Sequence, residues 1–156
     1  MPHWLFKTEP SCFSLEDLKQ RPGMTEPWDG VRNYQARNFL RDAVQVGDRV
    51  LFYHSNIAEP AVVGIAEVVR AGYPDITARD PESEHFDPAA TAADPRWFMV
   101  DVRFVREFPQ PVTLERIKAN PILADMPLVR RSRLSIQPVT PEQWRIILAM
   151  GGIAEE

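Results

Sequence analysis

Three segments dense in β-branched and aromatic residues constrain the fold of this 156-residue chain most. Residues 48–55 and 61–69 have the composition of strands and are separated by a short loop at residues 56–60. Residues 97–108 alternate, with one side formed by Phe98, Val100, Val102 and Phe104 and the other by Trp97, Met99, Asp101 and Arg103. A period of two predicts a strand with one buried face. The chain is therefore expected to fold around a β-sheet.

Short helices are predicted beside these strands. Ser14 followed by Asp17 resembles an N-cap with an acidic residue at the third helical position, which predicts a helix at residues 15–20. Near the other end, Thr140 and Gln143 have the spacing of a capping box, and this helix is expected to run to the glycines at 151 and 152. The remaining predicted elements are strands at residues 3–7 and 134–137, and helices at 33–42 and 113–118.

The order of these elements predicts an α+β fold. Strands and helices do not alternate strictly, so a small curled barrel with helices packed outside is favoured over a doubly wound parallel sheet. The length fits a single domain spanning residues 1–156. Cys12 is the only cysteine, which excludes an intramolecular disulfide. No apolar run approaches the ~20 residues of a membrane span, and the N-terminus lacks the pattern of a signal peptide, so a cytoplasmic location is expected.

The charge is distributed unevenly along the chain. The formal net charge is −4, which alone does not suggest a nucleic-acid-binding protein. Residues 71–101, however, hold two arginines against seven acidic residues, a local net charge of −5, so the remainder of the chain is slightly positive. That remainder contains two arginine groups, one at positions 32, 37 and 41 and one at 130, 131 and 133. A locally basic surface is compatible with this pattern, although charge runs are more often solvated faces.

Catalytic, cofactor and metal motifs are missing from the sequence. It has no phosphate-binding glycine loop, no dinucleotide fingerprint and no nucleophile elbow. The three histidines, His3, His54 and His85, are scattered without the spacing of a metal site. We therefore expect a non-enzymatic protein with neither cofactor nor metal.

Aromatic and amide side chains gather instead at the ends of predicted segments, at residues 28–38 and 53–56. A protein that inspects a single extruded base needs aromatic faces to hold the ring and polar groups to read its edge. The competing interpretation of Trp28 and Tyr53 is ordinary core packing, and that of Asn33 is an N-cap of the following helix. Both interpretations stay open for each residue at this point.

Six stretches of the chain resemble the EVE domain: residues 4–11, 28–38, 51–56, 71–75, 97–104 and 133–138. The resemblance implies a PUA-like fold, which is a small mixed β-barrel with short helices packed around it. It also implies non-catalytic binding of DNA or RNA that carries a modified base, with a 5-substituted cytosine such as 5-methylcytosine or 5-hydroxymethylcytosine as the leading candidate. No membrane partner is expected, and the oligomeric state is not predicted.

The resemblance also suggests roles for individual residues. The base-binding set that it implies is Trp28, Asn33, Tyr34, Tyr53, Ser55, Asn56 and Trp97. The residues expected near the phosphate backbone are Lys7, Arg32 and Arg37. One position departs from the family pattern, because Phe86 stands where relatives commonly carry tyrosine.

Two functions of other classes compete with this hypothesis. The first is an enzyme that acts on a nucleotide or nucleoside, with acid-base chemistry supplied by Lys7, Glu9, Asp29 or His54. Against it, no spacing in the sequence fixes two of these groups together. Alternatively, the acidic loop at residues 73–96 docks a basic protein partner, which would make the chain a protein-interaction module.

Overall fold

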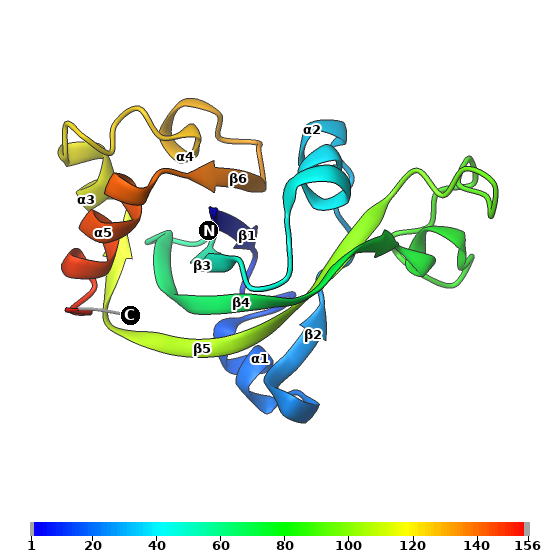
Figure 1. The fold of residues 1–156 in the computed structure, drawn as a ribbon, viewed down its shortest axis with the longest axis horizontal. Coiled ribbons are helices and arrows are strands. Elements are labelled where there is room, and N and C mark those ends of the chain that lie inside the picture. The colour runs from blue at the N-terminus through cyan, green and yellow to red at the C-terminus, as the bar shows by residue number, and fades with distance from the viewer. Residues whose placement is uncertain (1, 155–156) are drawn as a thin grey trace.

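A six-stranded mixed sheet organises the computed structural model, which describes residues 2–154 (Figure 1). Its strand order is β2-β5-β4-β3-β1-β6, and all neighbours are antiparallel except the parallel pair β1 and β3. The strands are β1 (His3–Thr8), β2 (Thr25–Pro27), β3 (Arg49–His54), β4 (Ala61–Pro74), β5 (Phe98–Thr113) and β6 (Ile136–Val139). The prediction of an α+β, PUA-like fold is confirmed.

The sheet is curled but not closed, which corrects the expectation of a complete barrel. The two edge strands, β2 and β6, have three and four residues and pair with β5 and β1 respectively. Closure requires edge strands to pair with each other along their length, and strands this short offer few groups for that. The curl comes from the long β4–β5 hairpin, whose register shifts at several points bend the pair around the core (Figure 1).

The predicted capping boxes are confirmed at both ends of the chain. Helix α1 (Leu15–Gln20) has the reciprocal Ser14 and Asp17 bonds, and α5 (Pro141–Met150) has those of Thr140 and Gln143. The backbone N–H of Ile153 then donates to the carbonyl of Leu148 at 2.9 Å, and Gly152 adopts a φ of +85°. This pattern is a Schellman motif, whose left-handed residue favours glycine.

The two other predicted helices are present close to their expected ranges, although the first changes its geometry halfway. The helix expected at residues 33–42 is α2 (Tyr34–Asn38) followed by one wider turn, η2 (Phe39–Ala43). The helix begun by Thr113 is α3 (Leu114–Ala119). Four short elements were not predicted: η1 (Pro22–Met24), β2, η3 (Ile76–Arg79) and α4 (Pro127–Arg130). Tertiary contacts decide such elements, since three or four residues carry too little pattern to predict them.

Residues 75–97 form a long excursion between β4 and β5, with one short turn, η3 (Ile76–Arg79) (Figure 1). The excursion folds back on the start of β5, where Trp97 and Met99 are buried. Val100 and Val102, which point to the opposite face, are buried as well. The expectation of one buried face is thus wrong at the start of this strand. In the part of the chain that the structure describes, no helix is long and apolar enough to cross a membrane.

The core lies on both faces of the sheet. Because neighbouring residues of a strand point to opposite faces, Phe6 and Phe52 enter one hydrophobic cluster while Leu5 and Tyr53 enter another. Trp28 belongs to the cluster with Phe6 and Phe52. The two aromatic residues predicted to form one pocket, Trp28 and Tyr53, therefore lie in separate clusters.

Candidate nucleic-acid interface

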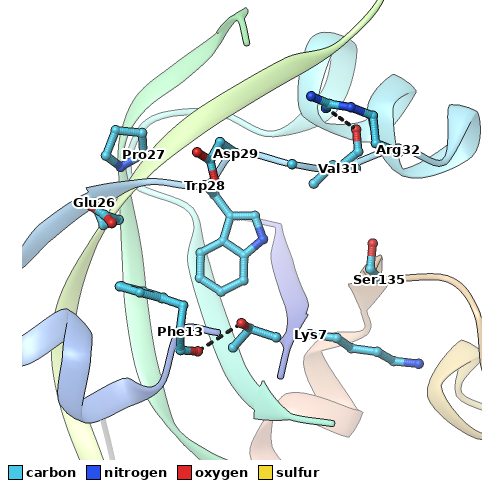
Figure 2. Close-up of a pocket in the computed structure, with 11 residues that line it drawn as sticks. Lys7, Phe13, Glu26, Pro27, Trp28, Asp29, Val31, Arg32 and Ser135 are labelled. Atoms are coloured by element: carbon cyan, nitrogen blue, oxygen red, sulfur yellow. Dashed lines mark hydrogen bonds between the residues drawn. The ribbon is translucent and has the colours of Figure 1, made fainter. Parts of the chain in front are cut away.

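A cavity of about 210 Å³ opens beside the indole of Trp28 (Figure 2). One wall is the loop after β2, which contributes Trp28 and Val31, and another is the end of β1 with Lys7. Phe13, just before α1, and Ser135, just before β6, complete the enclosure. Segments far apart in sequence therefore meet here because β1, β2 and β6 belong to one sheet. We call this space the Trp28 cavity.

Trp28 is at once a wall of this cavity and part of the core. Its ring lies 5.4 Å from both Phe6 and Phe52 and 6.2 Å from Phe13, between ring centroids. Its backbone N–H donates to the carbonyl of Val100 at 2.7 Å, and the residue is only 7% exposed. The three phenylalanines thus fix the orientation of the indole. In Figure 2 the indole nitrogen points toward the side where Val31 and Ser135 lie.

Lys7 places a cation between the Trp28 cavity and the space next to it. Its backbone N–H donates to the carbonyl of Ser135, and its Nζ donates to the carbonyl of Ser132 at 2.8 Å. Burial lowers the pKa of Lys7, because the charged form loses hydration. These bonds hold the turn before β6 against β1.

A buried carboxylate fixes the loop that carries Trp28. Asp75 is 1% exposed and accepts hydrogen bonds from the backbone N–H of Gly30 at 2.9 Å and from the guanidinium of Arg32 at 3.1 Å. Thr77 donates to its other oxygen. Burial opposes ionisation of Asp75, but the hydrogen bonds from Thr77, Gly30 and Arg32 outweigh it and lower the pKa. The remaining donors of Arg32 bind the carbonyls of Val31 and His85.

Two acidic side chains line the cavity, and they differ in their partners and in their hydration. Glu26 accepts from the guanidinium of Arg21 at 3.1 Å. Asp29 is exposed as a residue, yet its carboxyl is partly desolvated. This desolvation is the main cause that raises the pKa of Asp29, and the negative charge of Asp75 is the second. Among residues 2–154, Glu26 is thus ion-paired, whereas Asp29 forms no ion pair.

Two further hollows continue from the Trp28 cavity. The first, about 510 Å³, shares Lys7, Thr8 and Ser135 with it and includes Ser55 and Asn56. The second, about 360 Å³, shares Ser132 and Arg133 with the first. We call the two together the arginine groove, which is lined among others by Asn33, Ser55, Asn56, Arg130, Arg131 and Arg133. These three arginines form one of the two arginine groups of the sequence, and no site role was predicted for them.

The polar residues predicted for base contact lie along the arginine groove rather than in the Trp28 cavity. Asn33 caps α2, since its Oδ1 accepts from the backbone N–H of Ala36 at 2.9 Å. Asn56 has a φ of +58° and donates to the carboxylate of Glu9. Ser55 lies beside it, where β3 ends. The structure thus brings these three residues to one continuous surface with Lys7 and Trp28.

Tyr53 is placed away from the Trp28 cavity. It is 2% exposed within the second hydrophobic cluster, and burial raises its pKa to about 12. The ammonium of Lys7 lies 6.0 Å from the centroid of its ring. Tyr53 lines neither the cavity nor the groove, because it lies on the sheet face opposite Phe52.

Tyr34 and Trp97 form a separate aromatic pair. Their rings are stacked with centroids 4.9 Å apart, and the indole of Trp97 donates to Asp87 at 2.7 Å. The guanidinium of Arg37 covers Tyr34 at 4.9 Å and donates to the carbonyl of Arg96 at 2.6 Å. This pair ties the excursion to α2, and neither ring lines the Trp28 cavity or the arginine groove.

Of the four groups of the enzymatic alternative, His54 lies apart from the other three. Lys7 and Asp29 line the Trp28 cavity and Glu9 the adjoining groove. His54 lies in a different hollow, where its Nε2 accepts the backbone N–H of Leu15 at 3.1 Å and burial lowers its pKa. Among residues 2–154, no group of three histidine, cysteine or acidic side chains is placed to hold a metal ion.

Several cavity residues carry no sequence signal of their own. Phe13, Val31 and Ser135 are separated by more than a hundred positions from first to last, and each has an ordinary structural interpretation in sequence. Val31 and Ser135 lie within segments that resemble the EVE domain, residues 28–38 and 133–138, whereas Phe13 lies in none of them. The fold is what makes them neighbours.

Comparison with known proteins identifies close relatives of the whole chain. The family model described as EVE domain matches residues 2–150. Thymocyte nuclear protein 1 of Gallus gallus is 44% identical over 165 residues, which cover 95% of this chain and 68% of that protein. A hypothetical protein from Leishmania major has a solved structure that is 51% identical, with a TM-score of 0.91 and coverage of 97% of this chain and 95% of that one.

A further solved structure contains a ligand. It is that of human THYN1 protein in complex with 5-methylcytosine-containing DNA. It is 42% identical to this chain, with a TM-score of 0.92, and covers 97% of this chain and 98% of that one.

Proposed function

This chain belongs to the EVE domain family, and we propose that it binds nucleic acid carrying a modified base, most specifically a 5-substituted cytosine such as 5-methylcytosine or 5-hydroxymethylcytosine. The base is flipped out of its strand and enters the Trp28 cavity. The observation that carries this proposal is one open cavity, walled by a fixed aromatic ring, that leads into a groove with three arginines.

The cavity suits a single small ring. Its volume of about 210 Å³ is below the ~300–1,000 Å³ typical of sites for drug-sized ligands. Phe13, Pro27 and Val31 supply apolar surface for a substituent on the base, and Trp28 supplies the aromatic wall. Stacking on an aromatic side chain is worth about 1–3 kcal/mol per base.

The arginine groove suits the strand that carries the flipped base. Arg133 lines both of its hollows, and Lys7 stands where the groove joins the cavity. Cations at this junction are placed to bind the flanking phosphates, which position a nucleic acid without reading its sequence. The acidic excursion lines neither the cavity nor the groove, and it is held by the Tyr34–Trp97 stack on one side and by the bonds of Asp75 to Gly30 and Arg32 on the other.

The similarity to human THYN1 supports the choice of ligand, because that relative was solved with 5-methylcytosine-containing DNA. The proposal assigns no catalytic step to the site. Lys7 is engaged with the Ser132 carbonyl and His54 with the Leu15 backbone, in separate hollows.

Binding to matched oligonucleotides with a single 5-methylcytosine or cytosine tests the proposal, in single strands and in duplexes. We expect tighter binding to the methylated strand, and we expect Ser135→Phe to abolish the difference by filling the cavity. Ser11→Phe is the matched control, since Ser11 is exposed and lines neither the cavity nor the groove. Equal affinity for both oligonucleotides, or a Ser135→Phe protein that keeps the preference, contradicts the proposal.

A further inference from the structure

Most polar side chains of the Trp28 cavity are already engaged within the protein. The Thr8 hydroxyl donates to the carbonyl of Phe13 at 2.9 Å, and Lys7 donates to Ser132. Glu26 is paired with Arg21, and the guanidinium of Arg32 is divided among the Asp75 carboxylate and two backbone carbonyls. These internal bonds hold each of these side chains in one orientation.

Three polar groups at the cavity are not engaged in this way. Across residues 2–154, neither the indole N–H of Trp28 nor the hydroxyl of Ser135 has a protein hydrogen-bond partner. The carboxyl of Asp29 accepts from its own backbone N–H and from no other hydrogen-bond donor in that range, and the nearby imidazole of His85 acts on it only through its charge. The cavity thus presents one acceptor-only group and two groups able to donate.

We infer that Asp29 is a specificity-determining residue, which accepts a hydrogen bond from the exocyclic amine of a bound cytosine. This inference rests on the proposed function. The hydrogen-bonding edge of cytosine has one amine donor and two acceptors, N3 and O2, which complements one carboxylate and two donors. Contact between an acidic side chain and the cytosine amine is an established form of base recognition.

The same arrangement rejects thymine, which carries the same 5-methyl group. Thymine has a carbonyl oxygen where cytosine has its amine, so the Asp29 carboxylate faces another acceptor. A partly desolvated carboxylate left without a donor is costly, and Asp29 is desolvated enough for its pKa to be raised, with the Asp75 charge adding to this effect. Apolar walls alone cannot make this distinction, because the two bases have nearly the same shape.

The experiment measures the affinities of oligonucleotides that differ only in one base, which is 5-methylcytosine, cytosine or thymine. A good base-edge contact provides about 1–3 kcal/mol of discrimination, so we expect the natural protein to prefer 5-methylcytosine to thymine by roughly 5- to 150-fold. Asp29→Asn is expected to bring this ratio close to one, since an amide can donate as well as accept. The ratio also cancels the general gain in affinity for phosphates when a negative charge is removed.

Glu59→Gln is the matched control, because it makes the same acid-to-amide change at an exposed residue outside the cavity and groove. It is expected to keep the natural ratio. Suppose that 5-methylcytosine is preferred to cytosine. If Asp29→Asn then leaves the ratio of 5-methylcytosine to thymine unchanged, or if the natural protein does not discriminate against thymine, the role of Asp29 is overturned and the proposed function stands. If 5-methylcytosine and cytosine bind equally, the proposed function fails and the inference falls with it.

Discussion

The backbone N–H of Gly30 donates to the buried carboxylate of Asp75 across 2.9 Å, although the two residues are 45 positions apart. Gly30 has a φ of +76°, and a Cβ atom at this position would lie 2.7 Å from the ring of His85. The excursion between β4 and β5 thus supplies both the anchor and the close neighbour of the loop that carries Trp28. The shape of the cavity depends on a segment that does not line it.

Gly30→Ala is therefore expected to destabilise the protein. The left-handed conformation costs about 1–2 kcal/mol for a residue with a Cβ, and the contact with His85 adds to it. Gly23→Ala is the matched control, because Gly23 also has a positive φ, +63°, but a Cβ there would meet only Thr25 Oγ1, at an ordinary contact distance of 3.8 Å. Urea unfolding of both variants, and of Gly30→Ala combined with His85→Ala, separates the two costs. The explanation is wrong if Gly30→Ala costs no more than Gly23→Ala.

Substitutions at Trp28 separate its two roles. Trp28→Ala removes a ring packed against three phenylalanines and is expected to cost about 3–5 kcal/mol of stability. Trp28→Phe keeps most of that packing and loses the indole N–H, so we expect a folded protein with weaker binding to the methylated oligonucleotide. Chemical unfolding and oligonucleotide titration of the same preparations test this. Full affinity in the Trp28→Phe protein would show that the indole does not serve the ligand.

Arg133 is expected to contribute to affinity without contributing to base preference. Arg133→Gln removes one cation from the arginine groove, so binding should weaken equally for methylated and unmethylated strands, and the logarithmic salt slope should fall by about one. Arg145→Gln, on the exposed side of α5, is the matched control and should leave the slope unchanged. A change in base preference on replacing Arg133 would assign it to the base instead.

The stability of the fold is expected to fall as the solution becomes mildly acidic. Burial lowers the pKa of His54 below its usual value of 6.5, an effect that the charge of Asp17 only partly offsets. Near pH 6 the unfolded chain therefore binds more protons than the folded protein. The contribution of neutral His54 to the free energy of unfolding is complete above pH 6.5 and is lost as the pH falls below it. His54→Gln should flatten the pH dependence of the free energy of unfolding in this window. An unchanged slope would mean that His54 ionises normally in the folded protein.

Local chemistry made part of the fold predictable. The capping boxes at Ser14 and Thr140 were correct because each rests on groups within three residues of one another. The strands at residues 48–55 and 61–69 were found for the same reason, although β4 continues to Pro74. The barrel expectation failed at closure, which depends on how far short edge strands pair and not on any local pattern.

The candidate site was predictable in its residue types and not in its membership. Of the residues predicted to contact the base, Trp28 lines the cavity, whereas Asn33, Ser55 and Asn56 line the adjoining groove. Lys7, predicted near the phosphate backbone, lines both. Tyr53 and Trp97 are also aromatic but lie elsewhere. Tyr53 points to the other face of its strand, and Trp97 packs within the excursion. Sequence alone therefore determined the longer elements, the two capping boxes and the family, since these depend on neighbouring residues or on motifs. Only the tertiary structure decided which side chains share the cavity, because a two-residue period and long-range strand pairing set which distant groups meet.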